Sequence, residues 1–300
     1  MRAPSMVKLR IAATLLLVGS ALVPCDSREQ KAQCSVVGQL LIRPIKSKIF
    51  NNSRMLRIWL PPGYDAVEQR NRRYPVLYLN DGQNLFDACT SIFNSQEWRV
   101  DETATELVQS GKIRPIIIVG IDNAGKRERP KEYLPFPDDT LTPATPEVHG
   151  RDYPRFLLDE VMPLINKEFR TDISAESTGL GGSSYGAGIA LYTVMNYPDK
   201  FGRLLLESPS LYAHDDYLLH EAGRVPQWPE RVYVGVGSIG EPVDDVHRLA
   251  EILRHDGLGR GRVLVVEEPG AAHDENAWAK RFPLALQFLY GERRQLKPTH

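Results

Sequence analysis

The sequence predicts an α/β fold, in which a mostly parallel central sheet is covered by helices on both faces. Short apolar runs without polar alternation, such as 115–121 and 203–207, are typical of strands that are buried on both sides. Segments with apolar residues at i, i+3 and i+4 alternate with these runs, as they do where helices connect parallel strands. No internal repeat and no linker interrupts this pattern, so we expect one large domain.

The individual elements follow from periodicity and from turn residues. A helix is expected where Ala104 and Leu107 share one face and Gly111 follows the last turn. Residues 187–195 are apolar on all sides, as in a buried helix. The expected strands cover 39–45, 55–60, 75–79, 115–121, 177–181, 203–207, 232–236 and 263–266. The expected helices cover 100–110, 152–167, 187–195, 246–253 and 275–290.

The N-terminal residues differ from the rest. Lys8 and Arg10 precede an apolar run at 11–23 that is shorter than a membrane span, a pattern typical of a secretory signal. We therefore expect a signal peptide at 1–27, a folded domain at 35–291 and a tail at 292–300, in an exported protein that is periplasmic or secreted. Cys25 follows a sequence that resembles a bacterial lipoprotein signal, although Pro24 is unfavourable there. Contact with a membrane is expected only if Cys25 is lipidated.

Composition excludes several classes of partner. Lys and Arg number 37 against 38 Asp and Glu, so no basic stripe indicates nucleic-acid binding. The seven histidines are scattered and no C-x-x-C or H-E-x-x-H motif occurs, so we expect no metal site and no cofactor. Of the three cysteines, Cys34 and Cys89 could pair in an oxidising compartment, although their spacing does not decide it.

One short turn carries the strongest chemical signal. Residues 182–186 read Gly-Ser-Ser-Tyr-Gly and lie between an expected strand and an expected helix. A strand that reverses sharply into a helix at G-x-S-x-G exposes the central serine at the tip of the turn. The flanking glycines let strand and helix approach closely. Ser184 is therefore the expected nucleophile, against the alternative of a glycine-rich turn with an incidental serine.

A serine hydroxyl needs two partners to act as a nucleophile near neutral pH. An imidazole must take its proton, and a carboxylate must orient that imidazole. In this architecture the residues follow in the order serine, acid, histidine. His273 is expected to be the base, because it follows the last strand at loop distance. The alternatives His247 and His255 fall on or beside an expected surface helix.

The acid should follow the strand at 232–236. Glu241 comes first and is our expected acid, with Asp244 as the second candidate. Asp244 and Asp245 could instead favour the positive N-terminus of the next helix. The choice between Glu241 and Asp244 stays open at this point.

Acyl transfer also needs hydrogen-bond donors for the oxyanion. The backbone N–H of Tyr185, the residue after the nucleophile, is one expected donor. The second should come from the loop after the strand at 75–79, and we expect the N–H of Gln83. The alternative is that Asp81 and Gly82 form only a turn.

Several further motifs occur in one fixed order along the chain. They are Leu60-Pro61-Pro62-Gly63-Tyr64, Tyr74-Pro75-Val76-Leu77-Tyr78, Asp81-Gly82-Gln83-Asn84-Leu85-Phe86, Trp98, Asp101-Glu102, Val119-Gly120-Ile121-Asp122-Asn123, Arg129, Glu132-Tyr133, the elbow, Ser208-Pro209-Ser210, His273-Asp274-Glu275 and Trp278. Over about 47–291 the chain thereby resembles the "putative esterase" family of α/β-hydrolases. That family includes carbohydrate acetyl and feruloyl esterases, enterochelin-type siderophore esterases and mycolyltransferases.

The resemblance implies an α/β-hydrolase fold with a serine nucleophile at Ser184 and a base at His273. The chain departs from the family pattern at Ala187, where a second glycine is common, and in its acid, which lies one residue further from Gly237 than usual. The expected activity is hydrolysis of small-molecule or carbohydrate-linked esters, of sugar-linked, aryl or siderophore type. The alternatives are acyl transfer from the same acyl-enzyme, and a non-catalytic binding protein that keeps the fold.

Three segments are expected to line the substrate pocket. They are the Pro-, Asp- and Thr-rich stretch at 122–150, the segment 89–96 and Trp98. Arg127 or Arg129 could receive an anionic substrate. The alternative is a salt bridge within the loop, for instance between Arg129 and Glu132.

Overall fold

The computed structural model describes residues 34, 36–93, 95–138, 147–259 and 261–292. The expected signal peptide at 1–27, with Cys25, and the tail beyond residue 292 lie outside the described residues. Among the residues that are described, no helix is long and apolar enough to cross a membrane.

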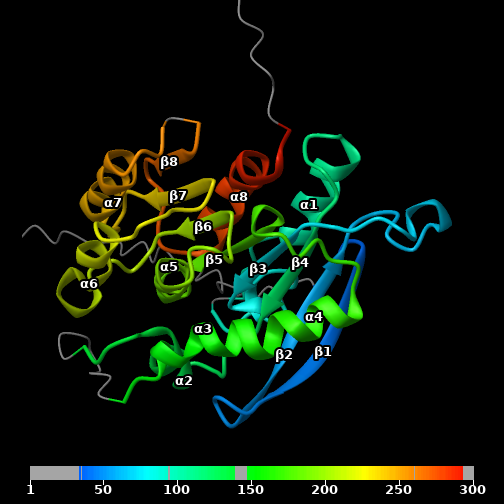
Figure 1. Ribbon diagram of the computed structural model, residues 1–300, viewed down its shortest axis with the longest axis horizontal. Coiled ribbons are helices and arrows are strands. Elements are labelled where there is room, and N and C mark those ends of the chain that lie inside the picture. Colours follow the sequence, from blue (N-terminus) through cyan, green and yellow to red (C-terminus); the bar gives the residue numbers. More distant parts are fainter. Residues whose placement is uncertain (1–33, 35, 94, 139–146, 260, 293–300) are drawn as a thin grey trace, which may run out of the picture. The chain divides into compact units, whose positions relative to one another are not determined.

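The described strands form one sheet of eight, in the order β1-β2-β4-β3-β5-β6-β7-β8 (Figure 1). From β4 to β8 all neighbouring strands run parallel, whereas β2 is antiparallel to both β1 and β4. The sheet is therefore mostly parallel, as expected. The strands are β1 Gln39–Ser47, β2 Asn52–Leu60, β3 Val76–Asn80, β4 Ile117–Ile121, β5 Thr178–Ser183, β6 Arg203–Glu207, β7 Arg231–Gly237 and β8 Val263–Glu268.

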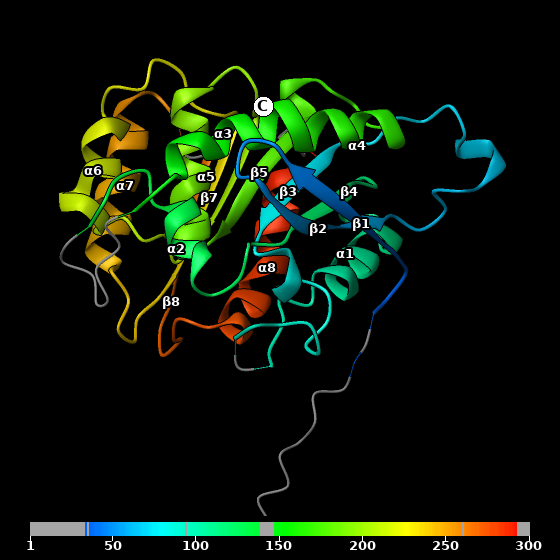
Figure 2. The same cartoon turned by 90° about the horizontal axis from the view of Figure 1, so that it is seen from below.

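Helices cover both faces of this sheet, as Figure 2 shows. Apolar residues of α1 and α8 form one core cluster with one face of the strands, and α3 to α7 contribute to the other cluster. The helices are α1 Val100–Gln109, α2 Glu128–Tyr133, α3 Tyr153–Arg155, α4 Met162–Glu168, α5 Tyr185–Asn196, α6 Ala213–Ala222, α7 Val243–His255 and α8 Glu275–Tyr290. This arrangement confirms the expected α/β architecture.

The central strands are buried because they are covered on both sides. Every residue of β3, β4, β5 and β6 is buried, which explains the apolar runs in β3, β4 and β6 and the small residues of β5. Helix α5 is buried from Gly186 to Val194 and packs against β5 and β6. The strand before the elbow and the helix after it are thus both fixed in the core.

Three helical regions differ from the sequence expectation. Helix α2 lies within the segment 122–150 that was expected to be a loop. The expected helix at 152–167 is divided, because the π-helical segment Phe156–Val161 separates α3 from α4. Helix α6 was not expected. Its first turn contains three consecutive residues with positive φ, His214 to Asp216, so no regular apolar period marks its beginning.

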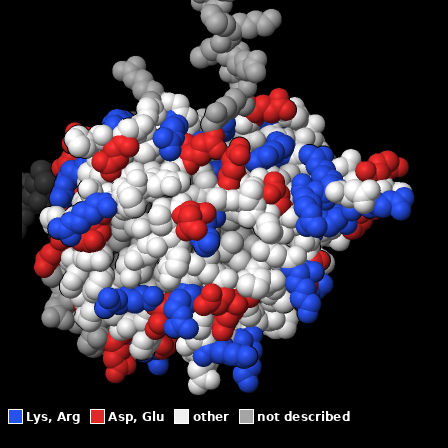
Figure 3. Space-filling view, viewed as in Figure 1, with Lys and Arg blue, Asp and Glu red and all other residues white. Residues whose placement is uncertain are grey.

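The surface carries mixed charge. On the face shown in Figure 3, Lys and Arg side chains alternate with Asp and Glu, with uncharged surface between them. This pattern agrees with the balanced composition.

Candidate active site

Ser184 lies at the tip of the turn between β5 and α5. Its backbone has φ 55° and ψ −128°, a strained conformation for a residue with a side chain. The Ser184 N–H donates to the carbonyl of Glu207, and the Ser184 carbonyl accepts from Ala187 and Gly188 at the start of α5. The turn therefore fixes Ser184 at the carboxyl end of the sheet, where ligands bind in such folds.

The two elbow glycines are needed for close approach. A Cβ on Gly182 would lie 2.8 Å from the backbone of Gly186, and a Cβ on Gly186 would lie 2.9 Å from Asp81 Oδ2. Asn80 adds a tie across the turn, since its side-chain amide donates to the carbonyl of Gly186 at 2.7 Å. The spacing of G-x-S-x-G thus reflects the contact between strand and helix.

His273 and Glu241 meet at the same end of the sheet. His273 Nδ1 lies 2.9 Å from Glu241 Oε2, and the Glu241 side chain is fully buried. Glu241 follows β7 and His273 follows β8, so adjacent parallel strands deliver the pair. Asp244, the other candidate acid, is exposed on the first turn of α7.

The surroundings of Glu241 favour its charged form. Burial acts to raise the pKa of Glu241, but hydrogen bonds from His273 and Ser208 outweigh it, and the net pKa is lower than the ordinary value. The carboxylate is therefore ionised near neutral pH and can stabilise an imidazolium.

Ser184 contacts another serine in this conformation. Ser184 Oγ lies 3.4 Å from Ser210 Oγ, and no hydrogen bond joins Ser184 to His273 among the described residues. The side chains of Ser184 and His273 nevertheless line one cavity of about 180 Å³. Hydrogen bonds between catalytic residues often form only when substrate is bound, so the missing bond between Ser184 and His273 is compatible with a catalytic pair.

The two amides expected to bind the oxyanion have no backbone acceptor among the described residues. They are the N–H groups of Tyr185 and Gln83. Gln83 is held by its side chain, whose Oε1 accepts from the N–H of Asn123 at 3.2 Å. Asp81, just before it, has φ 59° and turns the chain back from the end of β3. Free, rigidly held amides of this kind can bind an oxyanion.

Only some of the segments expected to line the substrate pocket do so. Arg129 and Phe93 line the cavity of Ser184. Trp98 does not: it is buried and packs on Trp278 and Phe282, 5.7 and 6.0 Å between ring centroids, so the expectation for Trp98 was wrong. Its apolar ring belongs to the core between α1 and α8. Within the expected loop at 122–150, residues 128–133 form α2 and residues 139–146 lie outside the described part.

Comparison with known families supplies the deciding observation. The model of the family described as "Putative esterase" matches residues 47–289. The chain belongs to this esterase family. Membership supports the hydrolysis of carboxylic esters, in agreement with the resemblance seen in the sequence.

Individual relatives of this esterase are distant. The uncharacterized protein YbbA of Bacillus subtilis is 25% identical over 81% of this chain and 94% of its own length. An endo-1,4-beta-xylanase/feruloyl esterase of Xylanibacter ruminicola is 26% identical over 78% of the chain, which spans only 29% of that protein. A siderophore enterobactin esterase of Emericella nidulans is 29% identical over half of each chain.

Solved structures show the same fold. The enterobactin esterase FES of Shigella flexneri superposes with a TM-score of 0.65 at 22% identity, over 85% of this chain and 59% of that chain. The BES protein of Bacillus cereus gives a TM-score of 0.66 at 18% identity, over 87% of this chain and 98% of that one. The esterase thus has the α/β-hydrolase fold.

Sequence reasoning missed the residues that support Glu241. Ser208 Oγ donates to Glu241 Oε1 at 2.7 Å and accepts from Trp278 Nε1 at 3.1 Å. Ser208 directly follows β6 and has φ 44°. Its place after a parallel strand was the signal that could have identified it.

Arg129 has a different partner from the one considered. Its guanidinium makes two hydrogen bonds to Asp81, at 2.8 and 2.9 Å, and both residues are buried. Glu132 pairs instead with Arg54. The alternative of a salt bridge for Arg129 is therefore right in kind, but its partner is Asp81 and not Glu132. The sequence could not show that α2 turns Arg129 towards the end of β3.

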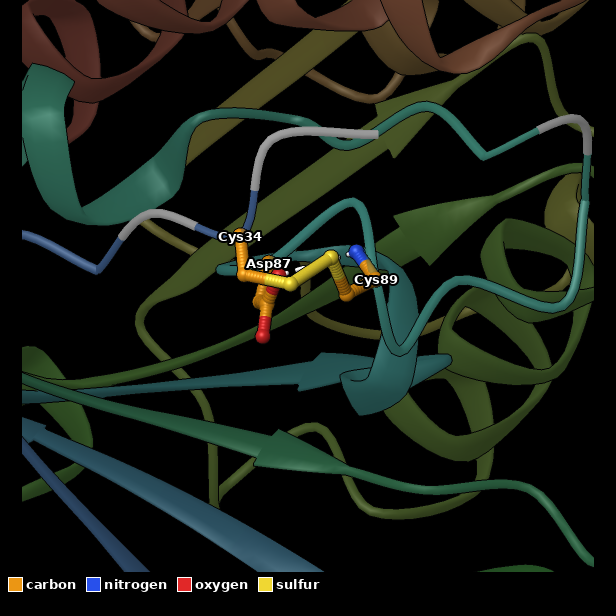
Figure 4. Close-up of side chains that lie close together, drawn as sticks. All are labelled: Cys34, Asp87 and Cys89. Carbon is orange, nitrogen blue, oxygen red and sulfur yellow. Dashed lines mark hydrogen bonds between the residues drawn. A yellow bond between two sulfur atoms is a disulfide. The ribbon is translucent and has the colours of Figure 1, made fainter. Parts of the chain in front are cut away.

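Cys34 and Cys89 form a disulfide, with 5.3 Å between their Cα atoms (Figure 4). Asp87 lies beside it and accepts a hydrogen bond from the backbone N–H of Cys89 at 2.8 Å. Both sulfurs are consumed in the disulfide, so this group offers no thiolate to a metal. The bridge ties the described N-terminus to the segment that precedes Phe93.

Proposed function

We propose that this esterase is a serine hydrolase that cleaves carboxylic esters through an acyl-enzyme on Ser184. The proposal rests on the strained turn that presents Ser184 in the same cavity as His273. The buried carboxylate of Glu241 contacts His273 Nδ1 and can orient its ring. A nucleophile and a base in one cavity, together with an acid that orients the base, are the parts that acyl transfer requires.

The reaction starts with a rotation of the Ser184 side chain from Ser210 towards His273. Ser184 Oγ then attacks the ester carbonyl while His273 Nε2 takes its proton. Glu241 keeps Nδ1 protonated and stabilises the imidazolium. His273 returns the proton to the leaving alcohol, and water releases the acid from Ser184 by the reverse sequence of proton transfers.

The N–H groups of Tyr185 and Gln83 are the proposed oxyanion donors. Both amides lack backbone acceptors among the described residues, and both belong to turns that the core fixes. Preorganised donors cost no rearrangement when charge develops on the carbonyl oxygen.

A second pocket, of only about 20 Å³, would have to widen by side-chain movement to accept an aryl or other apolar acyl group. It shares Tyr185 and Ser210 with the surroundings of Ser184 and is lined mainly by apolar and aromatic side chains. Phe136 lines it and stacks on His214, and its ring centroid lies 4.3 Å from that of Tyr217. The relatives whose names specify feruloyl and siderophore esters point to the same class of substrate.

We also propose that the protein is exported. The Cys34–Cys89 disulfide supports this location, because such bridges persist in oxidising compartments. Sequencing the N-terminus of the protein recovered from periplasm or medium tests it, and a mature chain that begins near residue 28 is the expected result.

The test of the activity uses p-nitrophenyl acetate, butyrate and benzoate with wild type and Ser184→Ala. The variant should lose at least about a thousandfold in kcat, because removal of one triad member leaves only binding and oxyanion stabilisation. A fluorophosphonate should label Ser184 in the wild type. Ser53→Ala, an exposed serine on β2, is the matched control and should keep full activity. Wild-type turnover by Ser184→Ala would refute the proposal.

A further inference from the structure

One carboxyl group in the cavity of Ser184 has no part in the mechanism above. Glu275 lies two residues after His273, in the first turn of α8, and lines the same cavity as Ser184 and His273. Its residue surface is only 2% exposed. Asn84 Nδ2 donates a weak hydrogen bond of 3.3 Å to its carboxyl, which also accepts from the backbone N–H of Glu275 itself.

The other acid of this cavity is already neutralised. Asp81 accepts two hydrogen bonds from Arg129 and one from Asn123. Glu275 differs, because no Lys or Arg lies within ion-pair distance of it among the described residues. A substrate group that enters the cavity therefore meets an uncompensated carboxyl at Glu275.

The position of Glu275 in the cavity suits a contact with the leaving alcohol. His273 gives its proton to the leaving oxygen, so the alcohol must occupy the part of the cavity next to His273. Trp278 packs edge-on against His273, with 5.2 Å between ring centroids, and Glu275 lines the same cavity, whereas the smaller aromatic pocket contains neither His273 nor Glu275. The acyl group and the alcohol are thereby assigned to different surroundings, one aromatic and one polar.

We propose that Glu275 selects the leaving alcohol, accepting a hydrogen bond from a hydroxyl of a neutral polyol and repelling an alcohol that carries a carboxylate. The inference rests on the proposed ester hydrolysis and adds the chemical class of the alcohol. A buried carboxylate gains from a hydroxyl donor and is destabilised by a second negative charge at short range.

The charges around Glu275 predict how this selection depends on pH. Burial raises the pKa of Glu275 to about 7, helped by the negative charges of Asp81 and Asp274 and opposed by Arg129. His273 lines the same cavity as Glu275. Glu275 should therefore be largely protonated at pH 6, when repulsion is weak, and largely ionised at pH 8.

The experiment compares four esters of one acyl group, the best acyl group of the p-nitrophenyl series. Their alcohols are butyl, 3,4-dihydroxybutyl, 3-carbamoylpropyl and 3-carboxypropyl, so the last two differ only by amide against carboxylate. The measured quantity is the ratio of kcat/KM for the 3-carbamoylpropyl ester to that for the 3-carboxypropyl ester, from pH 6 to pH 8. This ratio cancels every pH effect on the chemical steps that the two substrates share.

In the wild type the ratio should rise about tenfold between pH 6 and pH 8, and the dihydroxybutyl ester should exceed the butyl ester at pH 8. Glu275→Gln should flatten the ratio and raise kcat/KM for the carboxypropyl ester about tenfold at pH 8, with the carbamoylpropyl ester changed less than about twofold. Glu251→Gln, an exposed position on α7, is the matched control and should behave as wild type.

The outcomes separate the two proposals. A ratio that stays constant with pH in the wild type, or that rises equally in Glu275→Gln, overturns the selection by Glu275 while ester hydrolysis stands. A merely structural role for Glu275 would change all four esters by the same factor, which also overturns it. Failure of the wild type to hydrolyse any of the esters overturns the proposed function and this inference together.

Discussion

Ser208 donates a hydrogen bond to Glu241 Oε1, the carboxylate oxygen that does not face His273. Glu241 is therefore held from both sides, at 2.7 Å by Ser208 and at 2.9 Å by His273. Trp278 in turn donates to Ser208. The orientation of the candidate base thus depends on residues from three separate segments of the chain.

The first prediction concerns this support. Ser208→Ala should lower kcat about ten- to a hundredfold, because one oxygen of the buried Glu241 loses its partner. It should also raise the pKa of Glu241, since the Ser208 hydrogen bond lowers it. A pH profile of kcat with p-nitrophenyl acetate checks both effects. An unchanged profile would show that Ser208 does not position Glu241; Ser53→Ala is again the control.

The second prediction separates the two candidate acids. Glu241→Gln should lower kcat about a thousandfold, because the amide cannot stabilise an imidazolium as a carboxylate does. Asp244→Asn should stay within about twofold of wild type, since Asp244 is exposed on α7. Steady-state kinetics of the two variants decide the matter, and the reverse order of effects would assign the acid to Asp244.

The same carboxylate makes a prediction about stability and pH. Because the folded-state pKa of Glu241 is lowered, its ionisation stabilises the fold above the unfolded-state pKa of about 4.3, and this contribution is lost as pH falls through the folded value. Urea titrations from pH 3 to pH 7 should show a shallower acid loss for Glu241→Gln than for wild type. Parallel curves would contradict this linkage.

The third prediction tests the elbow. Gly186→Ala should destabilise the fold by about 1–3 kcal/mol and abolish most activity, because the new Cβ would lie 2.9 Å from Asp81 Oδ2 and 3.1 Å from Asn80 Cβ. Gly223→Ala is the matched control, since its Cβ would meet no atom closer than 4.0 Å. Equal stability of the two variants in urea would show that the elbow has room for a methyl group.

The fourth prediction distinguishes a structural from a substrate-binding arginine. Arg129→Ala should cost about 3–5 kcal/mol of unfolding free energy, because it leaves Asp81 buried without its partner. Arg127→Ala, at an exposed position of the same segment, should cost little. If Arg129→Ala kept wild-type stability and raised KM for anionic esters alone, Arg129 would instead bind substrate.

The fifth prediction concerns the disulfide. Reduction, or Cys89→Ser, should lower the unfolding free energy by about 3–4 kcal/mol, because the Cys34–Cys89 bridge closes a loop of 55 residues. Denaturant curves with and without dithiothreitol measure this difference. Identical curves in oxidised and reduced protein would mean that the bridge contributes nothing to stability.

Much of the fold could be predicted because its signals are local. The strand at 203–207 and the helix at 275–290 coincide with β6 and α8, since burial imposes an apolar pattern on consecutive residues. Ser184 could be identified for the same reason, because the strand, turn and helix that create the elbow are contiguous. Helix α6 was not predicted, because its irregular first turn carries no such pattern.

The tertiary structure decided which distant side chains meet. Glu241 and Asp244 both follow β7, and only the order of the strands brings Glu241 to His273, 32 residues away. Ser208 reaches Glu241 across 33 residues, and Arg129 reaches Asp81 across 48. The sequence alone determined the elbow, the strands and most of the long helices, since neighbouring residues encode them. The partners of Glu241 and Arg129 depend instead on how strands pair and helices pack, which no local pattern specifies.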